Sequence, residues 1–123
     1  MANSIFNYNN KDYECSLDLA MDVFGGKWKP MIIFHLKDAP MRSSALQLTL
    51  KNVSNKMFAQ SVRELVRDKL VKRTAYPCVP PKVEYELTDL GRSVLPIIMS
   101  MANWGEMFSG DTLGHNDGCT KEH

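Results

Sequence analysis

The pattern of apolar and polar positions is clearest over residues 54–92, where it predicts a helix, a hairpin and a second helix. Ser54 is a good N-cap, since its hydroxyl can accept a hydrogen bond from the first helical turn. Apolar residues then recur at the offsets of one helix face: Phe58, Val62, Leu65 and Val66. Residues 82–87 alternate with the period of a half-buried strand. This order of elements is that of a winged helix-turn-helix.

A second face of the same helix carries amide and basic side chains at spacings of 4, 3 and 4 residues: Lys56, Gln60, Arg63 and Arg67. Asn55 joins this face in the first turn. Such donors suit phosphates and the edges of bases. They also simply solvate an exposed face in many helices. The helix alone therefore leaves both interpretations open.

The flanking segments favour the first interpretation. Residues 42–50 read as a short helix with a capping box formed by Ser44 and Gln47, and the link over residues 51–53 lacks the glycine often found there. Residues 70–76 are the expected partner of the strand at 82–87. Three prolines stiffen the loop at 77–81, which is either a wing or a long hairpin loop.

Charge is concentrated in the same part of the chain. The whole chain of 123 residues has a net charge of +1, but residues 41–92 carry +5, residues 1–40 carry −1 and residues 93–123 carry −3. Basic charge on the proposed helix-turn-helix segment favours a nucleic-acid interface, whereas the acidic flanks and the near-zero net charge leave a protein-interaction module open. Together with the predicted order of elements, this basic segment predicts double-stranded DNA as the partner.

Two other helices are expected before this segment. Residues 16–24 form an amphipathic helix that ends at two glycines, and residues 28–36 are apolar on all sides, as in a buried helix. Trp28 is most simply a core anchor, with ligand stacking as the alternative. We expect Pro96 to interrupt the last helical region. Large apolar residues follow it: Ile97, Ile98, Met101, Trp104, Met107 and Phe108. They pack either in the chain's own core or against a second subunit.

The chain is short enough for one domain. We expect an arm over residues 1–14, a domain with its dimerisation helices over 15–108 and a disordered tail over 109–123. The fold class is mainly α with a small β hairpin (α+β). Three cysteines without paired spacing, no secretory signal and no membrane-spanning apolar run predict a cytoplasmic protein.

Motifs for catalysis or cofactor binding are not found, so neither an enzyme nor a cofactor is expected. A chelating group can be drawn from His115, Cys119 and His123, but their spacing matches no structural zinc pattern, and no metal site is predicted.

The chain resembles the HxlR family of winged-helix transcription regulators, relatives of the MarR group. Residues 25–28, 54–73 and 76–88 carry the resemblance, together with Cys15. It implies a homodimer joined through terminal helices, with two winged heads on DNA. It also implies that five residues enter the major groove, namely Ser54, Asn55, Lys56, Gln60 and Arg63, and that Lys82 meets phosphate or the minor groove.

Several similar family members sense oxidants or electrophiles through a cysteine before the first helix, the position of Cys15. A helix N-terminus stabilises the reactive thiolate, whereas neighbouring carboxylates oppose it. A small interface residue is therefore the alternative role, and a small-molecule effector is equally open. Cys78 in the wing and Cys119 in the tail are not identifiable as disulfide partners. The alternative function is a winged-helix protein-interaction module without specific DNA binding.

Overall fold

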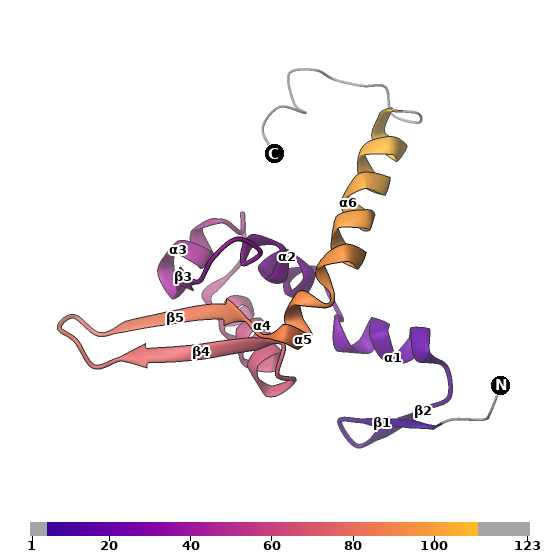
Figure 1. The fold of residues 1–123 in the computed structure, drawn as a ribbon, viewed down its shortest axis with the longest axis horizontal. Coiled ribbons are helices and arrows are strands. Elements are labelled where there is room, and N and C mark those ends of the chain that lie inside the picture. The colour runs from indigo at the N-terminus through magenta and orange to yellow at the C-terminus, as the bar shows by residue number, and fades with distance from the viewer. Residues whose placement is uncertain (1–4, 111–123) are drawn as a thin grey trace.

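The computed structural model describes residues 5–110. Its elements follow in this order: β1 (Phe6–Tyr8), β2 (Lys11–Tyr13), α1 (Ser16–Val23), α2 (Trp28–His35), β3 (Met41–Arg42), α3 (Ser43–Leu48), α4 (Asn55–Arg67), β4 (Val71–Tyr76), β5 (Lys82–Leu87), α5 (Asp89–Arg92) and α6 (Leu95–Phe108). Figure 1 shows the β4–β5 hairpin projecting from one side of the body and α6 from another. Helices α3 and α4 with this hairpin form a winged helix-turn-helix, which confirms the predicted fold class.

The turn between α3 and α4 is made without glycine. Asn52 supplies the left-handed conformation there, with φ of 69°. The predicted cap of α4 is confirmed, because the Met57 backbone N–H donates to Ser54 Oγ at 3.0 Å. The predicted capping box of α3 is wrong. That helix begins at Ser43 without a side-chain cap, and Gln47 Nε2 instead donates to Asn55 Oδ1 at 2.5 Å.

The wing strands pair in antiparallel register, from Val71 opposite Leu87 to Tyr76 opposite Lys82. Strand β3 pairs with the other edge of β5, so the sheet order is β3-β5-β4. The sequence analysis did not predict β3, because two residues are too short to show a period.

The core lies between the helices and this sheet. Its fully buried side chains come from α2 and the loop after it, α3, α4 and β4: Ile32, Ile33, Leu36, Leu46, Leu65 and Val71. Helix α2 is buried as predicted, and Trp28 packs against the core as the predicted anchor. Each fully buried aliphatic side chain stabilises the fold by about 1.5–3 kcal/mol through burial alone.

The N-terminal segment forms a hairpin that the sequence analysis did not predict. Asn9 and Asn10 join β1 to β2 with φ of 54° and 64°, the two left-handed positions of a tight hairpin turn. The hairpin packs on its own chain, because Tyr13 is buried and its hydroxyl donates to Asp22 Oδ2 at 2.5 Å. Residues 6–13 of the expected arm therefore form a hairpin that contacts α1 of their own chain.

Pro96 interrupts the last helical region, as predicted. Helix α5 begins after Thr88, whose Oγ1 accepts from the Gly91 N–H at 3.0 Å, and Pro96 lies in the first turn of the separate helix α6. Gly91 sits so close to the start of β4 that an added Cβ would lie 2.1 Å from the Leu70 carbonyl oxygen. Among residues 5–110, no helix combines the length and apolar character that crossing a bilayer requires.

Candidate nucleic-acid interface

Helix α4 brings five of the predicted DNA-binding residues onto one element: Ser54, Asn55, Lys56, Gln60 and Arg63. All five are exposed. Lys56 and Arg63 form no ion pair with any described residue. Gln60 is partly committed, since its Nε2 donates to Glu64 Oε2 at 3.1 Å. The two free cations are therefore the groups on this face most available to an anionic partner.

Arg67 differs from the prediction that placed it on the same cationic face. Its Nε donates to Asp68 Oδ1 at 3.0 Å, and its Nη2 donates to Tyr8 Oη at 2.8 Å. Tyr8 in turn donates to Asp68 Oδ2 at 2.7 Å, and burial followed by this hydrogen bond raises the pKa of Tyr8. The hydrogen bond that Arg67 donates to the Asp68 carboxylate likewise raises the pKa of Arg67. Arg67 thus ties the N-terminal hairpin to the end of α4.

Lys82 lies on the wing rather than on α4. Its Nζ is 3.4 Å from Glu84 Oε2 and 4.6 Å from the centroid of the Tyr76 ring. The Lys82 side chain is 31% exposed, so a phosphate can still reach the ammonium. Glu84 competes with a phosphate for the Lys82 ammonium, and the sequence analysis did not consider this ion pair.

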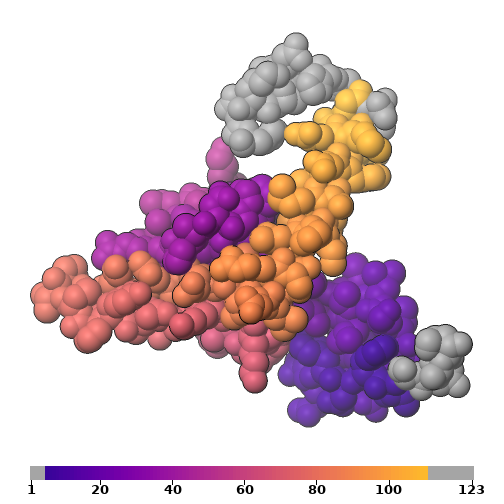
Figure 2. Space-filling model, viewed as in Figure 1, coloured from indigo at the N-terminus to yellow at the C-terminus, as the bar shows by residue number. Residues whose placement is uncertain are grey.

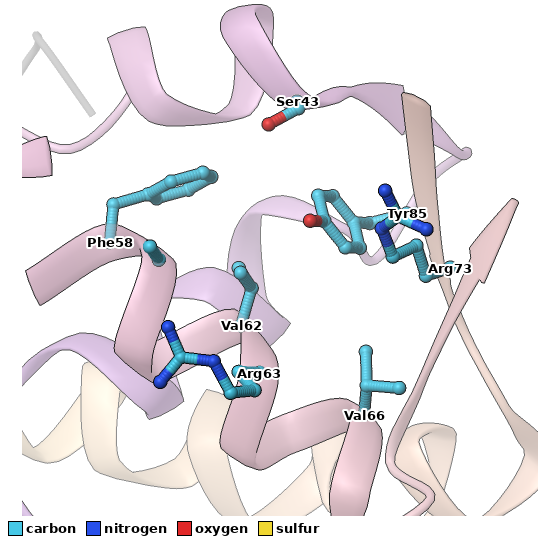
Figure 3. Close-up of a pocket in the computed structure, with 8 residues that line it drawn as sticks. Ser43, Phe58, Val62, Arg63, Val66, Arg73 and Tyr85 are labelled. Atoms are coloured by element: carbon cyan, nitrogen blue, oxygen red, sulfur yellow. The ribbon is translucent and has the colours of Figure 1, made fainter. Parts of the chain in front are cut away.

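A groove separates α4 from the wing strands (Figure 3). Arg63 lines it from α4, and Arg73 and Tyr85 line it from β4 and β5. The sequence analysis missed Arg73 and Tyr85 as members of this face. Their cross-strand pairing depends on the register of the hairpin, which a stretch of residues with poor alternation does not reveal.

A buried ion pair joins α2 to α4. Lys29 Nζ lies 2.5 Å from Glu64 Oε1, with the side chains 7% and 28% exposed. Lys29 also donates to the Val23 carbonyl oxygen at 3.3 Å. The hydrogen bond from Lys29 lowers the pKa of Glu64 against the opposing effect of burial. Because Glu64 also holds Gln60, this pair links the core to the exposed face of α4.

Cys15 is the N-cap residue of α1 and is exposed. The segment around it is braced by Tyr13, whose pKa is raised to about 12 by its hydrogen bond to Asp22. Cys78 is also exposed, and its thiol donates to the Pro80 carbonyl oxygen at 3.2 Å. Cys119 lies outside the described residues.

The three residues considered as a chelating group also lie outside the described residues. His115, Cys119 and His123 belong to residues 111–123, which the structure does not describe. Over residues 5–110 there is no group of three or more side chains with the ligand types for a metal ion.

Helix α6 presents an apolar stripe to solvent. Figure 2 shows this helix standing away from the body. Its exposed members recur at helical spacing, and they are Ile97, Met101, Trp104 and Phe108. The rings of Trp104 and Phe108 stack with centroids 5.2 Å apart. On α1, Leu17 and Met21 are 68% and 65% exposed. Both terminal helices thus carry apolar side chains that their own chain leaves uncovered.

The family model for HxlR-like helix-turn-helix proteins matches residues 23–112. The HTH-type transcriptional regulator YdeP of Bacillus subtilis is 38% identical over 102 residues, 82% of this chain and 80% of YdeP. The redox regulator HypR in its reduced form has a TM-score of 0.75 at 35% identity, covering 82% of this chain and all of that one. A MarR-family regulator from Porphyromonas gingivalis W83 has a TM-score of 0.74 at 40% identity, covering 77% and 93%. The chain therefore belongs to the HxlR-like helix-turn-helix family of transcriptional regulators.

Proposed function

We propose that the protein is a homodimeric regulator that binds specific DNA sequences and responds to oxidants or electrophiles through Cys15. The observation that carries the DNA-binding part is the exposed face of α4, where Lys56 and Arg63 have no carboxylate partner within residues 5–110. In this arrangement α4 enters the major groove. The residues that face the bases and phosphates are Ser54, Asn55, Lys56, Gln60 and Arg63.

The wing makes the second contact. Lys82 lies beside the loop of residues 77–81, and its ammonium exchanges Glu84 for a DNA phosphate or reaches into the minor groove. If about eight phosphates are neutralised in total, the logarithm of the binding constant falls with the logarithm of salt concentration with a slope of about −7.

The apolar residues of α6 and α1 form the dimer interface. Leaving six large side chains in water forgoes several kcal/mol at about 25 cal/mol per Å², which favours a partner surface. A twofold dimer places its two heads on half-sites about 34–36 Å apart, or a multiple of that distance.

Thiol sensing rests on the position and exposure of Cys15. The similar protein HypR is described as a redox regulator, in an oxidised as well as a reduced form. The family resemblance implies a sensing cysteine before the first helix, and Cys15 has that place in this chain. The thiolate is the form of a cysteine that reacts with oxidants and electrophiles.

Gel-shift titration tests the DNA-binding part, with duplex from beside the protein's own gene and a random duplex at two salt concentrations. Arg63→Ala weakens binding to the specific duplex by about 1–3 kcal/mol if Arg63 reads a base. Arg92→Ala is the control, since it removes an exposed arginine outside α4 and the wing. A protein that binds neither duplex at low salt is instead an interaction module.

Sensing is tested separately with diamide or a quinone. The unmodified protein releases its DNA after treatment, and Cys15→Ser retains it. Cys78→Ser is the matched control for an exposed thiol elsewhere. If the Cys15→Ser variant still releases its DNA after treatment, Cys15 is excluded as the sensor, and the proposal of DNA binding is unaffected.

A further inference from the structure

One side-chain hydrogen bond crosses the turn between α3 and α4. Gln47 lies in the last turn of α3, and Asn55 is the first residue of α4. The Gln47 Nε2 group donates to Asn55 Oδ1 at 2.5 Å. Gln47 is half-buried whereas Asn55 is exposed, so the more restricted side chain orients the freer one. The amide of Asn55 is therefore tied to α3 in the free protein.

This hydrogen bond determines which atoms of Asn55 remain available. An asparagine amide has an oxygen that accepts hydrogen bonds and a nitrogen that carries two donors. Because the amide is planar, directing its oxygen toward α3 also fixes the direction of its nitrogen. Within residues 5–110 this nitrogen donates to no acceptor. Asn55 thus offers a partner two N–H donors, while its oxygen is engaged.

The place of Asn55 gives these donors a target. The N-terminal residues of a recognition helix contact the edges of bases in the major groove. An unrestrained asparagine suits adenine, whose N6 amino group donates to the amide oxygen while N7 accepts from the amide nitrogen. Guanine instead presents two acceptors, O6 and N7, which the single nitrogen of a lysine can also contact together. An asparagine that offers only donors therefore matches guanine better than adenine.

We propose that Gln47 is a positioning residue that makes Asn55 a reader of guanine rather than of adenine. The inference rests on the proposed function, because it requires α4 in the major groove. Gln47 acts through the orientation of the Asn55 amide and not through a base contact of its own. Without Gln47, the Asn55 oxygen is free to accept from the N6 amino group of adenine.

The test uses a duplex that the unmodified full chain selects from a random pool. Every single base-pair substitution of this duplex is then measured by competition. Asn55→Ala identifies the position that Asn55 reads, because discrimination among the four bases is lost at that position alone. The expected base is guanine, with adenine bound about tenfold more weakly, or about 1.4 kcal/mol.

Two variants of Gln47 should change this preference. Gln47→Leu keeps an apolar stem but removes the donor, and the ratio of affinities for guanine and adenine should fall from about tenfold to about twofold. Gln47→Glu cannot donate to Asn55 Oδ1, and its carboxylate accepts from the Asn55 nitrogen instead. The amide then turns its oxygen outward, so the position should favour adenine or cytosine, whose amino groups donate.

Gln60→Leu is the matched control. It removes the same amide group from α4, where Gln60 binds Glu64, and it leaves the hydrogen bond between Gln47 and Asn55 in place. Whatever its effect on overall affinity, this variant should keep the preference for guanine at the position that Asn55 reads.

Several results would overturn the proposal. One is a preference of the unmodified protein for any base other than guanine at that position. Another is a guanine preference that both Gln47 variants leave unchanged. Weaker binding of every duplex by one common factor would then show that Gln47 only holds α3 against α4. If Asn55→Ala changes no base preference, Asn55 reads no base, although DNA binding stands. If the unmodified protein selects no duplex, the proposed function fails and this inference fails with it.

Discussion

Removing Glu64 from its ion pair with Lys29 should lower stability more than removing Lys29. Glu64→Gln leaves an ammonium that is 7% exposed without its charge partner, whereas Lys29→Met leaves a carboxylate that is 28% exposed and can meet water. Removing one partner of a buried pair costs about 3–5 kcal/mol. The introduced amide oxygen and the Val23 carbonyl still accept from Lys29, so we expect about 2–3 kcal/mol for Glu64→Gln.

The measurement is urea unfolding at one fixed protein concentration, since the stability of the proposed dimer would depend on concentration. Lys29→Met should lower the free energy of unfolding by about 1 kcal/mol. The double variant should have a free energy of unfolding close to that of Lys29→Met, because replacing both members of a buried pair is often nearly neutral. Glu86→Gln, which removes a carboxylate that forms no ion pair among the described residues, should change stability by less than about 0.5 kcal/mol. An equal or larger loss in Lys29→Met would refute the reasoning.

The same pair gives a pH dependence of known sign. Because the pKa of Glu64 is lowered in the folded protein, its stabilisation is complete above the ordinary pKa of a glutamate and is lost as pH falls through the lower folded value. The gap in stability between the unmodified protein and Glu64→Gln should therefore narrow below about pH 4. A constant gap down to pH 3 would contradict this assignment.

Three further outcomes are expected. Tyr8→Phe removes the hydroxyl that joins the N-terminal hairpin to Asp68, and hydrogen exchange should show faster opening of residues 6–13 with a loss of about 1 kcal/mol. Ser54→Ala should cost about 1 kcal/mol in thermal unfolding, whereas Ser44→Ala should cost close to nothing, because only the first caps a helix. Gly91→Ala should cost more than about 3 kcal/mol, since its Cβ would lie 2.1 Å from a backbone oxygen that cannot move alone.

The sequence predicted those parts of the fold that local pattern determines. The cap and apolar stripe of α4 span four turns, and β5 alternates over six residues, so both gave a clear period. The β1–β2 hairpin has strands of three residues, too short for a period. Its available signal was the pair Asn9 and Asn10, since asparagine tolerates the left-handed conformation that a two-residue turn needs.

The exposed residues of the candidate interface were predictable for the same local reason. Lys56, Gln60 and Arg63 share a helix face by spacing alone. Arg67 has the same spacing, yet it is bound by Tyr8, which lies 59 residues earlier in the chain. Arg73 and Tyr85 meet through strand register, and Lys29 finds Glu64 through the docking of α2 on α4. Partners of this kind are set by tertiary packing, which a local pattern does not contain.

These distant contacts determine how the exposed face of α4 is held. Gln47 of α3 binds Asn55 at the start of the helix, and Lys29 of α2 binds Glu64 in its middle. Tyr8 of the N-terminal hairpin binds the end, at Arg67 and Asp68. The last contact comes from the segment that leads directly to Cys15. In the proposed sensing role, a chemical change at Cys15 that shifts the hairpin would therefore reach α4 through the hydrogen bonds of Tyr8.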